Sequence, residues 1–345
     1  MKHFYPDYYK KFKCIAAECP DSCCKDWDVV VDDESQAFYE TVTDSFGKKL
    51  KSLTTVDGDG DRIFVSQNGK CPFWNNQGLC DIYINLGEEH LCSTCRSFPR
   101  ISQDYTAFCE HMLSFACPEA ARLMLEADKD FCYQTVICPY KGVDYSVDMM
   151  NFLLKARKST FEILNNLTLP FAERLRKILA FNVEIQNRLD NENYVPFDFS
   201  QFITPPIITH KSDCSFIFDL HKRLDIMDNS FRGFLENASN HSCHSKISNR
   251  YDKYFSALAK YYIFRYYLTA IDSFDVLSAI KRIVCAYTVI GHMLSSAKNL
   301  TAEQQILVIQ RYSKEVEHSY ENSELMEEEF FCNPNFSVTN LIKLL

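Results

Sequence analysis

The sequence is poor in glycine, with 9 in 345 residues, and none of them forms the Gly-rich turn of a Rossmann-type nucleotide site. The one glycine-dense stretch is Asp57-Gly58-Asp59-Gly60-Asp61. It fails as an EF-hand calcium loop because Arg62 stands where glycine is required and Asn68 where glutamate is required. We therefore expect a solvated turn there.

The chain also lacks a surplus of basic residues and a long apolar run. Its formal charge of −9 argues against a general nucleic-acid binder. The start of the sequence has no apolar segment of the kind that a secretory signal requires. The longest charge-free apolar stretch near the C-terminus, 283–297, is shorter than the roughly 18–20 residues that span a bilayer. We expect a cytoplasmic protein without a membrane partner, in which this stretch is a buried helix.

The length allows two hydrophobic cores, because single cores stop growing at roughly 250–300 residues. The composition changes near residue 140, from short apolar runs rich in cysteine to long segments with helical periodicity. The sequence predicts a mainly α protein in which a cysteine-rich, metal-binding unit with short strands (1–140) packs on a mostly α-helical body (141–345).

Capping and turn residues predict the individual elements. Asp33 and Gln36 suit the start of a short helix over 35–43, and Pro118 suits the first position of another. We expect extended segments at 62–65 and 81–84. Thr301 and Gln304 form a capping box for a helix over 302–319. Further helices are predicted at 147–165, from Pro170 onward, and at 215–227, 251–268 and 275–294.

Cysteine is the residue that is present in excess, with 16 in the chain and 12 of these within the first 138 residues. In a chain without a signal segment, this favours metal binding over a disulfide framework. Converging thiolates suit either tetrahedral zinc or an iron–sulfur cubane, and spacing alone leaves both open. Cys23 and Cys24 are adjacent and point in different directions, so we expect them to serve different roles or different metals.

The cysteine motifs also resemble a known family. The series C-x4-C-x3-C-C, Cys-Pro-Phe, Cys-x-Ile-Tyr and Cys-Arg-x-Phe-Pro resembles the zinc- or iron-chelating cysteine-cluster domains. The segment 114–122, SFACPEAAR, resembles the longer members of that group, the flagellin lysine-N-methylases. These motifs cover residues 4 to about 125, and the rest of the chain matches in length and in its helical, aromatic-rich character.

The resemblance implies methyl transfer from S-adenosylmethionine to lysine ε-amines of flagellin, in a protein that binds an iron–sulfur cluster of the 4Fe–4S type, with zinc as the alternative. Seven cysteines match the family positions, and Cys117 is an added candidate from the longer members. The expected metal ligands are Cys14, Cys19, Cys23, Cys24, Cys71, Cys80, Cys95 and Cys117. Because eight thiolates exceed the needs of one cluster, some of them are expected to be structural or to hold a second metal.

The position of the methyl donor is not visible in the sequence. The C-x3-C-x2-C motif of radical enzymes begins at Cys19 and Cys23 and is broken by Asp26. The aromatic run over 251–267 suits walls for a sulfonium or an alkylated ammonium, and equally suits a helix with an aromatic core face. The alternatives to an enzyme are a non-catalytic metal or redox module and a structural zinc adaptor. The catalytic base and the oligomeric state stay open.

Overall fold

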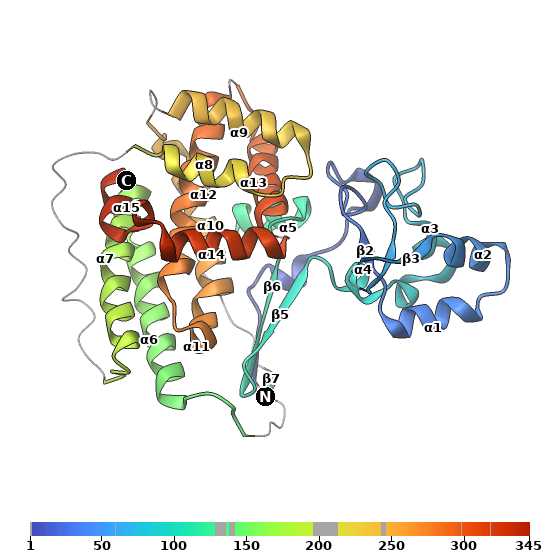
Figure 1. Cartoon of the computed structure of the whole chain (residues 1–345), viewed down its shortest axis with the longest axis horizontal. Helices are drawn as coiled ribbons and strands as arrows, with labels where there is room; N and C mark the ends of the chain where they lie inside the picture. The colour runs from blue at the N-terminus through green and yellow to red at the C-terminus, as the bar shows by residue number, and fades with distance from the viewer. Residues whose placement is uncertain are drawn as a thin grey trace.

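The computed structural model describes residues 2–58, 60–127, 136–137, 142–195, 213–242, 246–297, 299–317 and 319–345. The protein is mainly α-helical, as predicted. Figure 1 shows a large helical body on one side, a smaller cysteine-rich unit on the other, and a long strand hairpin that runs from the joint between them along the body.

The cysteine-rich unit has its own small core. Its sheet has the antiparallel order β2-β4-β3, with β2 at Val29–Val30, β3 at Thr54–Val56 and β4 at Arg62–Phe64. Its helices are α1 (Asp33–Thr41), α2 (Ser45–Ser52), α3 (Asp81–Leu86) and α4 (Ser93–Ser97). Tyr39, Leu50, Phe64 and Phe73 fill the core, together with the buried Cys71 and Cys92.

A second sheet joins the N-terminus to the helical body. Its strand order is β5-β6-β1-β7, with β1 at Lys2–Phe4, β5 at Arg100–Asp104, β6 at Phe108–Leu113 and β7 at Val136–Ile137. Strand β1 runs parallel to β6 and pairs His3 with Cys109. Helix α5 (Pro118–Glu126) follows β6 and begins at Pro118, as predicted.

The helical body is built around α12 (Leu277–Ser296), which packs against α7, α8, α9, α10, α13 and α14. This helix is long and apolar enough to cross a membrane, but 83% of its apolar window is buried inside the protein, so it is a core helix as expected. The surrounding helices are α6 (Val147–Leu164), α7 (Phe171–Asp190), α8 (Ser215–Arg223), α9 (Asn229–Ser242), α10 (Asp252–Tyr266), α11 (Ala270–Ser273), α13 (Ala302–Glu317), α14 (Tyr320–Cys332) and α15 (Val338–Leu344).

Most predicted elements are confirmed, and the capping box of α13 forms in both directions. The Thr301 amide donates to Gln304 Oε1 at 2.9 Å, and the Gln304 amide donates to Thr301 Oγ1 at 3.3 Å. The extended segment predicted at 81–84 is wrong: it is the helix α3, in which the Ile84 amide donates to the Cys80 carbonyl at 3.0 Å. The cap of α1 is Asp32 and not Asp33, since the Asp32 carboxylate accepts from the Ser35 amide.

The larger of the two hydrophobic cores contains residues from separate parts of the sequence. The larger core combines residues of the helical body with Tyr8, Phe12 and Phe108 from the N-terminal part of the chain. The smaller core runs from Val29 to Cys92. The predicted boundary at residue 140 stays a prediction. Because Phe108 of β6 lies in the larger core, the strands β1 and β6 pack with the helical body.

A cysteine cluster at the junction with the helical body

The structure brings the predicted cysteines into one neighbourhood from four separate parts of the chain. Cys14, Cys19 and Cys23 come from the loops before β2, and Cys117 precedes α5. We call these four the first thiol set. Cys14 interacts electrostatically with Cys19, with Cys23 and with Cys117. Burial raises the pKa of Cys117 to about 12, so this thiol is protonated unless a metal replaces its proton.

The second thiol set comprises Cys24, Cys71, Cys80 and Cys95. Hydrogen bonds donated by the thiols of Cys23 and Cys71 lower the pKa of Cys24 to about 3. Cys80 and Cys95 also interact electrostatically with Cys24. Cys24 thus accepts hydrogen bonds from two neighbouring thiols and lies at the centre of this set, while its neighbour Cys23 also interacts with Cys14 and Cys117.

Cys92 also belongs to this neighbourhood and was absent from the predicted ligands. It is buried, and the Cys95 thiol donates a hydrogen bond to it, which lowers the pKa of Cys92. The C-x2-C spacing of Cys92 and Cys95 was the signal in the sequence. The family motif matches Cys95 and does not include Cys92.

The donor set fits a metal or iron–sulfur centre. Every cysteine in the described ranges is a free thiol, and cysteine sulfur is the soft ligand that zinc and iron–sulfur clusters share. Tetrahedral zinc, with zinc–sulfur distances of about 2.3 Å, holds its sulfurs about 3.8 Å apart. Within the described residues, no three sulfurs of these sets form a group whose ligand atoms all lie within 4.8 Å of one another. Zinc and an iron–sulfur cluster therefore both stay predictions for these thiols.

Helix α13 joins the cysteine-rich unit to the helical body. Lys314, which is 3% exposed, donates to Asp21 Oδ1 at 3.1 Å and to Asp26 Oδ2 at 2.9 Å. Burial opposes the charge on Lys314, but the attraction of Asp21 and Asp26 outweighs it and raises the Lys314 pKa. Gln310 Nε2 donates to Asp21 Oδ2 at 2.9 Å and to the Ala116 carbonyl at 2.8 Å. We call these contacts the junction.

The junction lies directly beside the thiols. Cys19 Sγ donates to the carbonyl of Asp21 at 3.3 Å, and Ala116 precedes Cys117. On the same helix, the Oε1 atom of Gln310 and the hydroxyl of Ser313 are buried and have no hydrogen-bond partner among the described residues. Buried polar atoms are normally paired, so these two mark a place where an additional polar group would be stabilised.

The aromatic run over 251–267 faces the core and does not line an open wall. Tyr261, Tyr262 and Tyr266 donate to the carboxylate of Glu317 at 3.0, 3.1 and 3.0 Å, and Arg265 donates to it at 2.9 Å. Tyr261 and Tyr262 are 1% and 2% exposed. These phenols satisfy a buried carboxylate, so the alternative of an aromatic core face describes the run.

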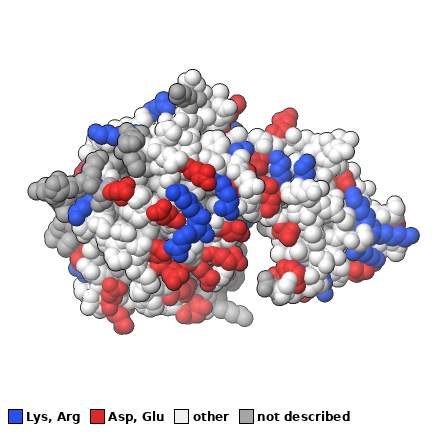
Figure 2. All heavy atoms as spheres, turned by 45° about the horizontal axis from the view of Figure 1, so that its top comes forward, with Lys and Arg blue, Asp and Glu red and all other residues white. Residues whose placement is uncertain are grey.

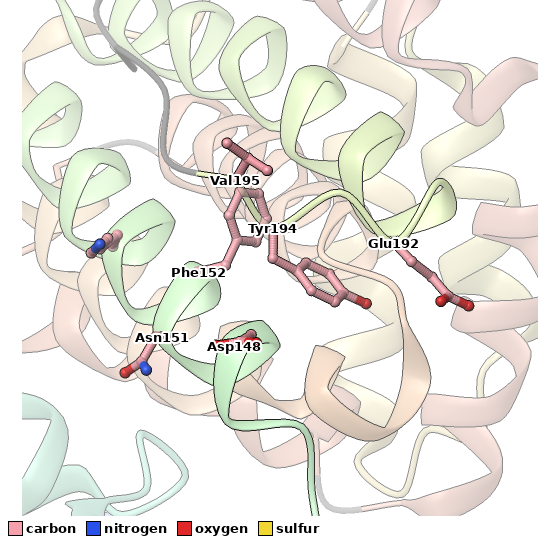
Figure 3. Close-up of a pocket in the computed structure, with 7 residues that line it drawn as sticks. Asp148, Asn151, Phe152, Glu192, Tyr194 and Val195 are labelled. Carbon is pink, nitrogen blue, oxygen red and sulfur yellow. The ribbon is translucent and has the colours of Figure 1, made fainter.

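A cavity of 490 Å³ lies in the helical body, between the first turns of α6 and the residues that follow α7. Figure 3 shows Asp148, Asn151 and Phe152 on one side of it and Glu192, Tyr194 and Val195 on the other. Val195 is the last described residue before 196–212, and none of the described cysteines lines the cavity. We therefore assign no ligand to it.

The charges on the face drawn in Figure 2 are mixed. Lys and Arg form a small group on the helical body with Asp and Glu beside it, and further basic residues lie at the far end of the cysteine-rich unit. This face carries no continuous basic surface of the kind that nucleic acids require.

Comparison with known proteins gives the family. The FliB lysine N-methylase C-terminal domain matches residues 157–344, which is more than half of the chain. The chain is 30% identical over 132 residues to a lysine-N-methylase of Salmonella typhimurium, covering 35% of this chain and 31% of the relative. It is 29% identical over 132 residues to the flagellar biosynthetic protein FliU of Salmonella muenchen, covering 35% of this chain and 75% of the relative.

A lysine-N-methylase of Salmonella choleraesuis matches in the same way, at 30% identity over 132 residues, covering 35% of this chain and 31% of the relative. The matched region thus spans about a third of the length of both curated lysine-N-methylases. No solved structure matches the chain. The matched C-terminal domain includes α13, whose Lys314 bonds to Asp21 and Asp26 in the loop that carries Cys19, Cys23 and Cys24. The protein belongs to the FliB lysine N-methylase family.

Proposed function

We propose that this protein transfers methyl groups from S-adenosylmethionine to lysine ε-amines of flagellin and that it binds an iron–sulfur cluster. The family and the names of the relatives, which are lysine-N-methylases and a flagellar biosynthetic protein, support this activity and substrate. The observation that carries the proposal is the junction, because it joins the thiols to the family's domain through Lys314 and Gln310.

The first thiol set would hold the cluster. Its members are Cys14, Cys19, Cys23 and Cys117, and Cys19 and Cys117 lie beside the junction. The second set, with Cys24 at its centre, would hold a second metal. When bound, the cluster supplies Lewis-acidic iron or a structural tie between the cysteine-rich unit and α5, and zinc is the alternative occupant.

The residues of the junction would prepare the lysine substrate. A lysine amine attacks the methyl group only in its neutral form, so the site must desolvate the amine or provide a base for its proton. The side chain of Asp26 is 30% exposed, whereas that of Asp21 is 11% exposed, and Lys314 holds both carboxylates. We therefore assign the proton to a carboxylate oxygen of Asp26.

The backbone at Asp26 supports a functional role for this residue. Its φ of 74° lies in the left-handed region, which residues other than glycine rarely adopt. The conformation is fixed by the Asp26 amide, which donates to the Gly69 carbonyl at 3.0 Å. Positions of this kind gather at functional sites, where the surrounding structure holds them in place.

The test is the intact mass of flagellin after co-expression with this protein in a flagellated host that lacks its own methylase. We expect mass increments of one methyl group each with the wild type. We expect none with the double variant Cys23→Ser, Cys24→Ser. The exposed Cys332 provides the matched control, and Cys332→Ser should leave the increments unchanged.

Two outcomes would contradict the proposal. Unmodified flagellin in cells that contain soluble, iron-loaded wild-type protein would favour a non-catalytic metal or redox module. If the purified protein contains zinc but no iron and still methylates flagellin, its metal centre is zinc and not an iron–sulfur cluster. Loss of methylation with Asp26→Asn, at unchanged iron content, would support the proton assignment.

A further inference from the structure

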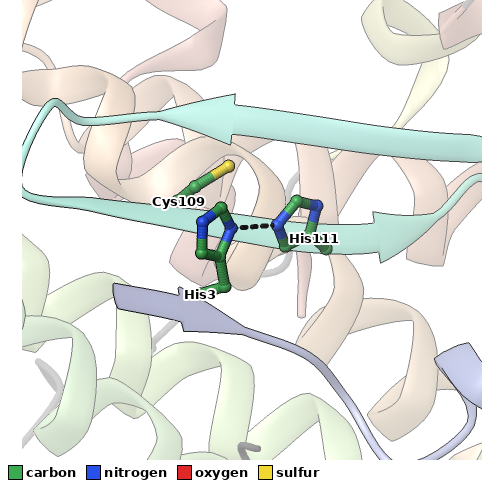
Figure 4. Close-up of side chains that lie close together, drawn as sticks. All are labelled: His3, Cys109 and His111. Carbon is green, nitrogen blue, oxygen red and sulfur yellow. Dashed lines mark hydrogen bonds between the residues drawn. The ribbon is translucent and has the colours of Figure 1, made fainter. Parts of the chain in front are cut away.

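A group of metal-ligating side chains lies outside both thiol sets, on the sheet that joins the N-terminus to the helical body. The ligand atoms of His3, Cys109 and His111 all lie within 4.8 Å of one another. Figure 4 shows the two imidazole rings facing each other, with the thiol beside them. We propose that these three side chains bind one Zn²⁺ ion.

The strand register brings the three ligands together. His3 lies on β1 and pairs with Cys109 on the parallel neighbour β6. His111 follows Cys109 by two positions, so both side chains leave β6 on the same face. The paired strands β1 and β6 are more than a hundred residues apart in the sequence. No local sequence motif therefore contains this ligand set.

The contacts around His111 prepare one of its nitrogens for a metal. Its Nδ1 lies 2.8 Å from Ser102 Oγ, and its Nε2 lies 2.8 Å from Nδ1 of His3. The Nδ1 proton can be donated to the Ser102 hydroxyl, which leaves the Nε2 lone pair directed at His3. The Tyr5 ring stacks on His111 with a centroid distance of 4.4 Å and keeps the imidazole in this orientation.

The ligand types and their spacing suit zinc. Two imidazoles and one thiolate form a known zinc ligand set, and three protein ligands leave the fourth position for water. Tetrahedral zinc with these ligands needs nitrogen–nitrogen and nitrogen–sulfur distances of about 3.3–3.6 Å. The group is thus close enough to form the site by small side-chain shifts. Cys109 is 6% exposed while both histidines are partly exposed, so water can reach the ion.

This group is separate from the cysteine cluster. Among the described residues, the charges that act on Cys109 come from Asp104 and Glu110, and none of the cysteines of the two thiol sets is among them. Binding of Zn²⁺ would displace the Cys109 thiol proton and replace the hydrogen bond between the two imidazoles by two metal–nitrogen bonds. The inference does not depend on methyl transfer, so it can fail or succeed independently of the proposed function.

The experiment measures zinc on the full-length protein with its iron in place. Zinc per chain and the Zn²⁺ dissociation constant are determined by competition with a chromogenic chelator. We expect one zinc equivalent more in the wild type than in His3→Ala or Cys109→Ser, at equal iron content. Ser102 is exposed, so Ser102→Ala should fold normally and should weaken zinc binding by about 10–100-fold.

Two controls separate this site from the cysteine cluster. Cys332→Ser should bind zinc like the wild type, and Cys23→Ser, Cys24→Ser should lose iron but keep the zinc that His3→Ala removes. Cobalt added in place of zinc should show the charge-transfer absorption of a single thiolate, and this band should be absent in Cys109→Ser. Wild-type zinc content and affinity in His3→Ala and Ser102→Ala would overturn the proposal and leave His3 and His111 as a hydrogen-bonded pair.

Discussion

Arg157 and Glu110 meet through two parallel hydrogen bonds, 2.8 Å from Nη1 to Oε2 and 2.6 Å from Nη2 to Oε1. Arg157 lies on α6 and Glu110 on β6, and their side chains are 7% and 3% exposed. This bidentate pair fastens the long hairpin to the helical body. The hairpin leads on to Cys117, so its position also affects that member of the first thiol set.

Arg157→Met should destabilise the protein by about 3–5 kcal/mol, because it leaves the Glu110 carboxylate buried without its partner. The measurement is the free energy of unfolding from urea titration. Arg122 provides a control, since its pairs with Glu119 and Glu126 lie at the surface and Arg122→Met should cost less than about 1 kcal/mol. Equal losses for both variants would show that the buried pair contributes no more than a surface pair.

Lys314→Met should lower the rate of flagellin methylation by at least about tenfold. A loss of about 1.4 kcal/mol in the stabilisation of the transition state already lowers a rate by this factor. The substitution removes the cation that holds Asp21 and Asp26. The measurements are flagellin mass and iron per chain. Lys281, a half-buried lysine on α12 that donates to the Phe330 carbonyl, provides the control, and Lys281→Met should leave methylation intact. Full methylation by Lys314→Met would remove the junction from the proposed mechanism.

Two metal centres should respond separately to cysteine substitutions. Cys117→Ser disturbs the first thiol set, and Cys80→Ser disturbs the second. Each variant should lose part of the metal held by the two thiol sets, and the double variant should lose nearly all of that metal while keeping the zinc proposed at His3, Cys109 and His111. Metal analysis and acid-labile sulfide on anaerobically purified protein provide the measurement. If each single variant loses all the metal of both thiol sets, the two sets act as one centre.

His221 should make the protein less stable as the pH falls below neutrality. It is fully buried, with Nδ1 2.7 Å from the Ile217 carbonyl and Nε2 2.9 Å from the Tyr312 hydroxyl. Burial lowers its pKa to about 4, whereas in the unfolded chain it titrates near 6.5. Between these values the unfolded chain binds more protons, so the stabilisation is fully present above about pH 6.5 and is lost toward pH 4.

The expected loss from His221 is about 2 kcal/mol at pH 5, since each unit of pKa difference corresponds to about 1.36 kcal/mol. Urea unfolding at pH 7.5 and pH 5 should show a weaker pH dependence for His221→Gln than for the wild type. His241 is exposed, so His241→Gln should keep the wild-type dependence. Identical pH dependence in all three proteins would contradict the burial argument.

The sequence predicted what is decided locally. Pro118 and the pair Thr301 and Gln304 begin helices because their side chains act within one turn. The prediction of an extended segment at 81–84 was wrong. An isoleucine next to a tyrosine favours a strand when only the local sequence is considered, whereas the surrounding loops make this segment a helix. Contacts between distant residues were beyond local patterns. Lys314 and Asp21 are 293 positions apart, and His3 and His111 are 108 positions apart.

The sequence also predicted the eight cysteine ligands but not their division into two sets. Spacing predicts that thiols gather, but the two sets follow from how the loops around Cys14 and Cys71 fold back on each other. Cys23 and Cys24 were expected to differ in role; their thiols share a hydrogen bond, and Cys23 also interacts with Cys14 and Cys117, so the different roles stay a prediction. Whether these thiols are the ligands stays a prediction until metal is measured.

Helix α13 carries Lys314 and Glu317 within a single turn. Lys314 bonds to the loop that contains Cys23 and Cys24, and Glu317 bonds to three phenols of the core. If loss of the metal shifts that loop, α13 would be displaced with it. The hydrogen bonds of Tyr261, Tyr262 and Tyr266 to Glu317 would then change. Their ultraviolet absorption would then act as an internal gauge of metal occupancy, readable in the protein without any attached dye.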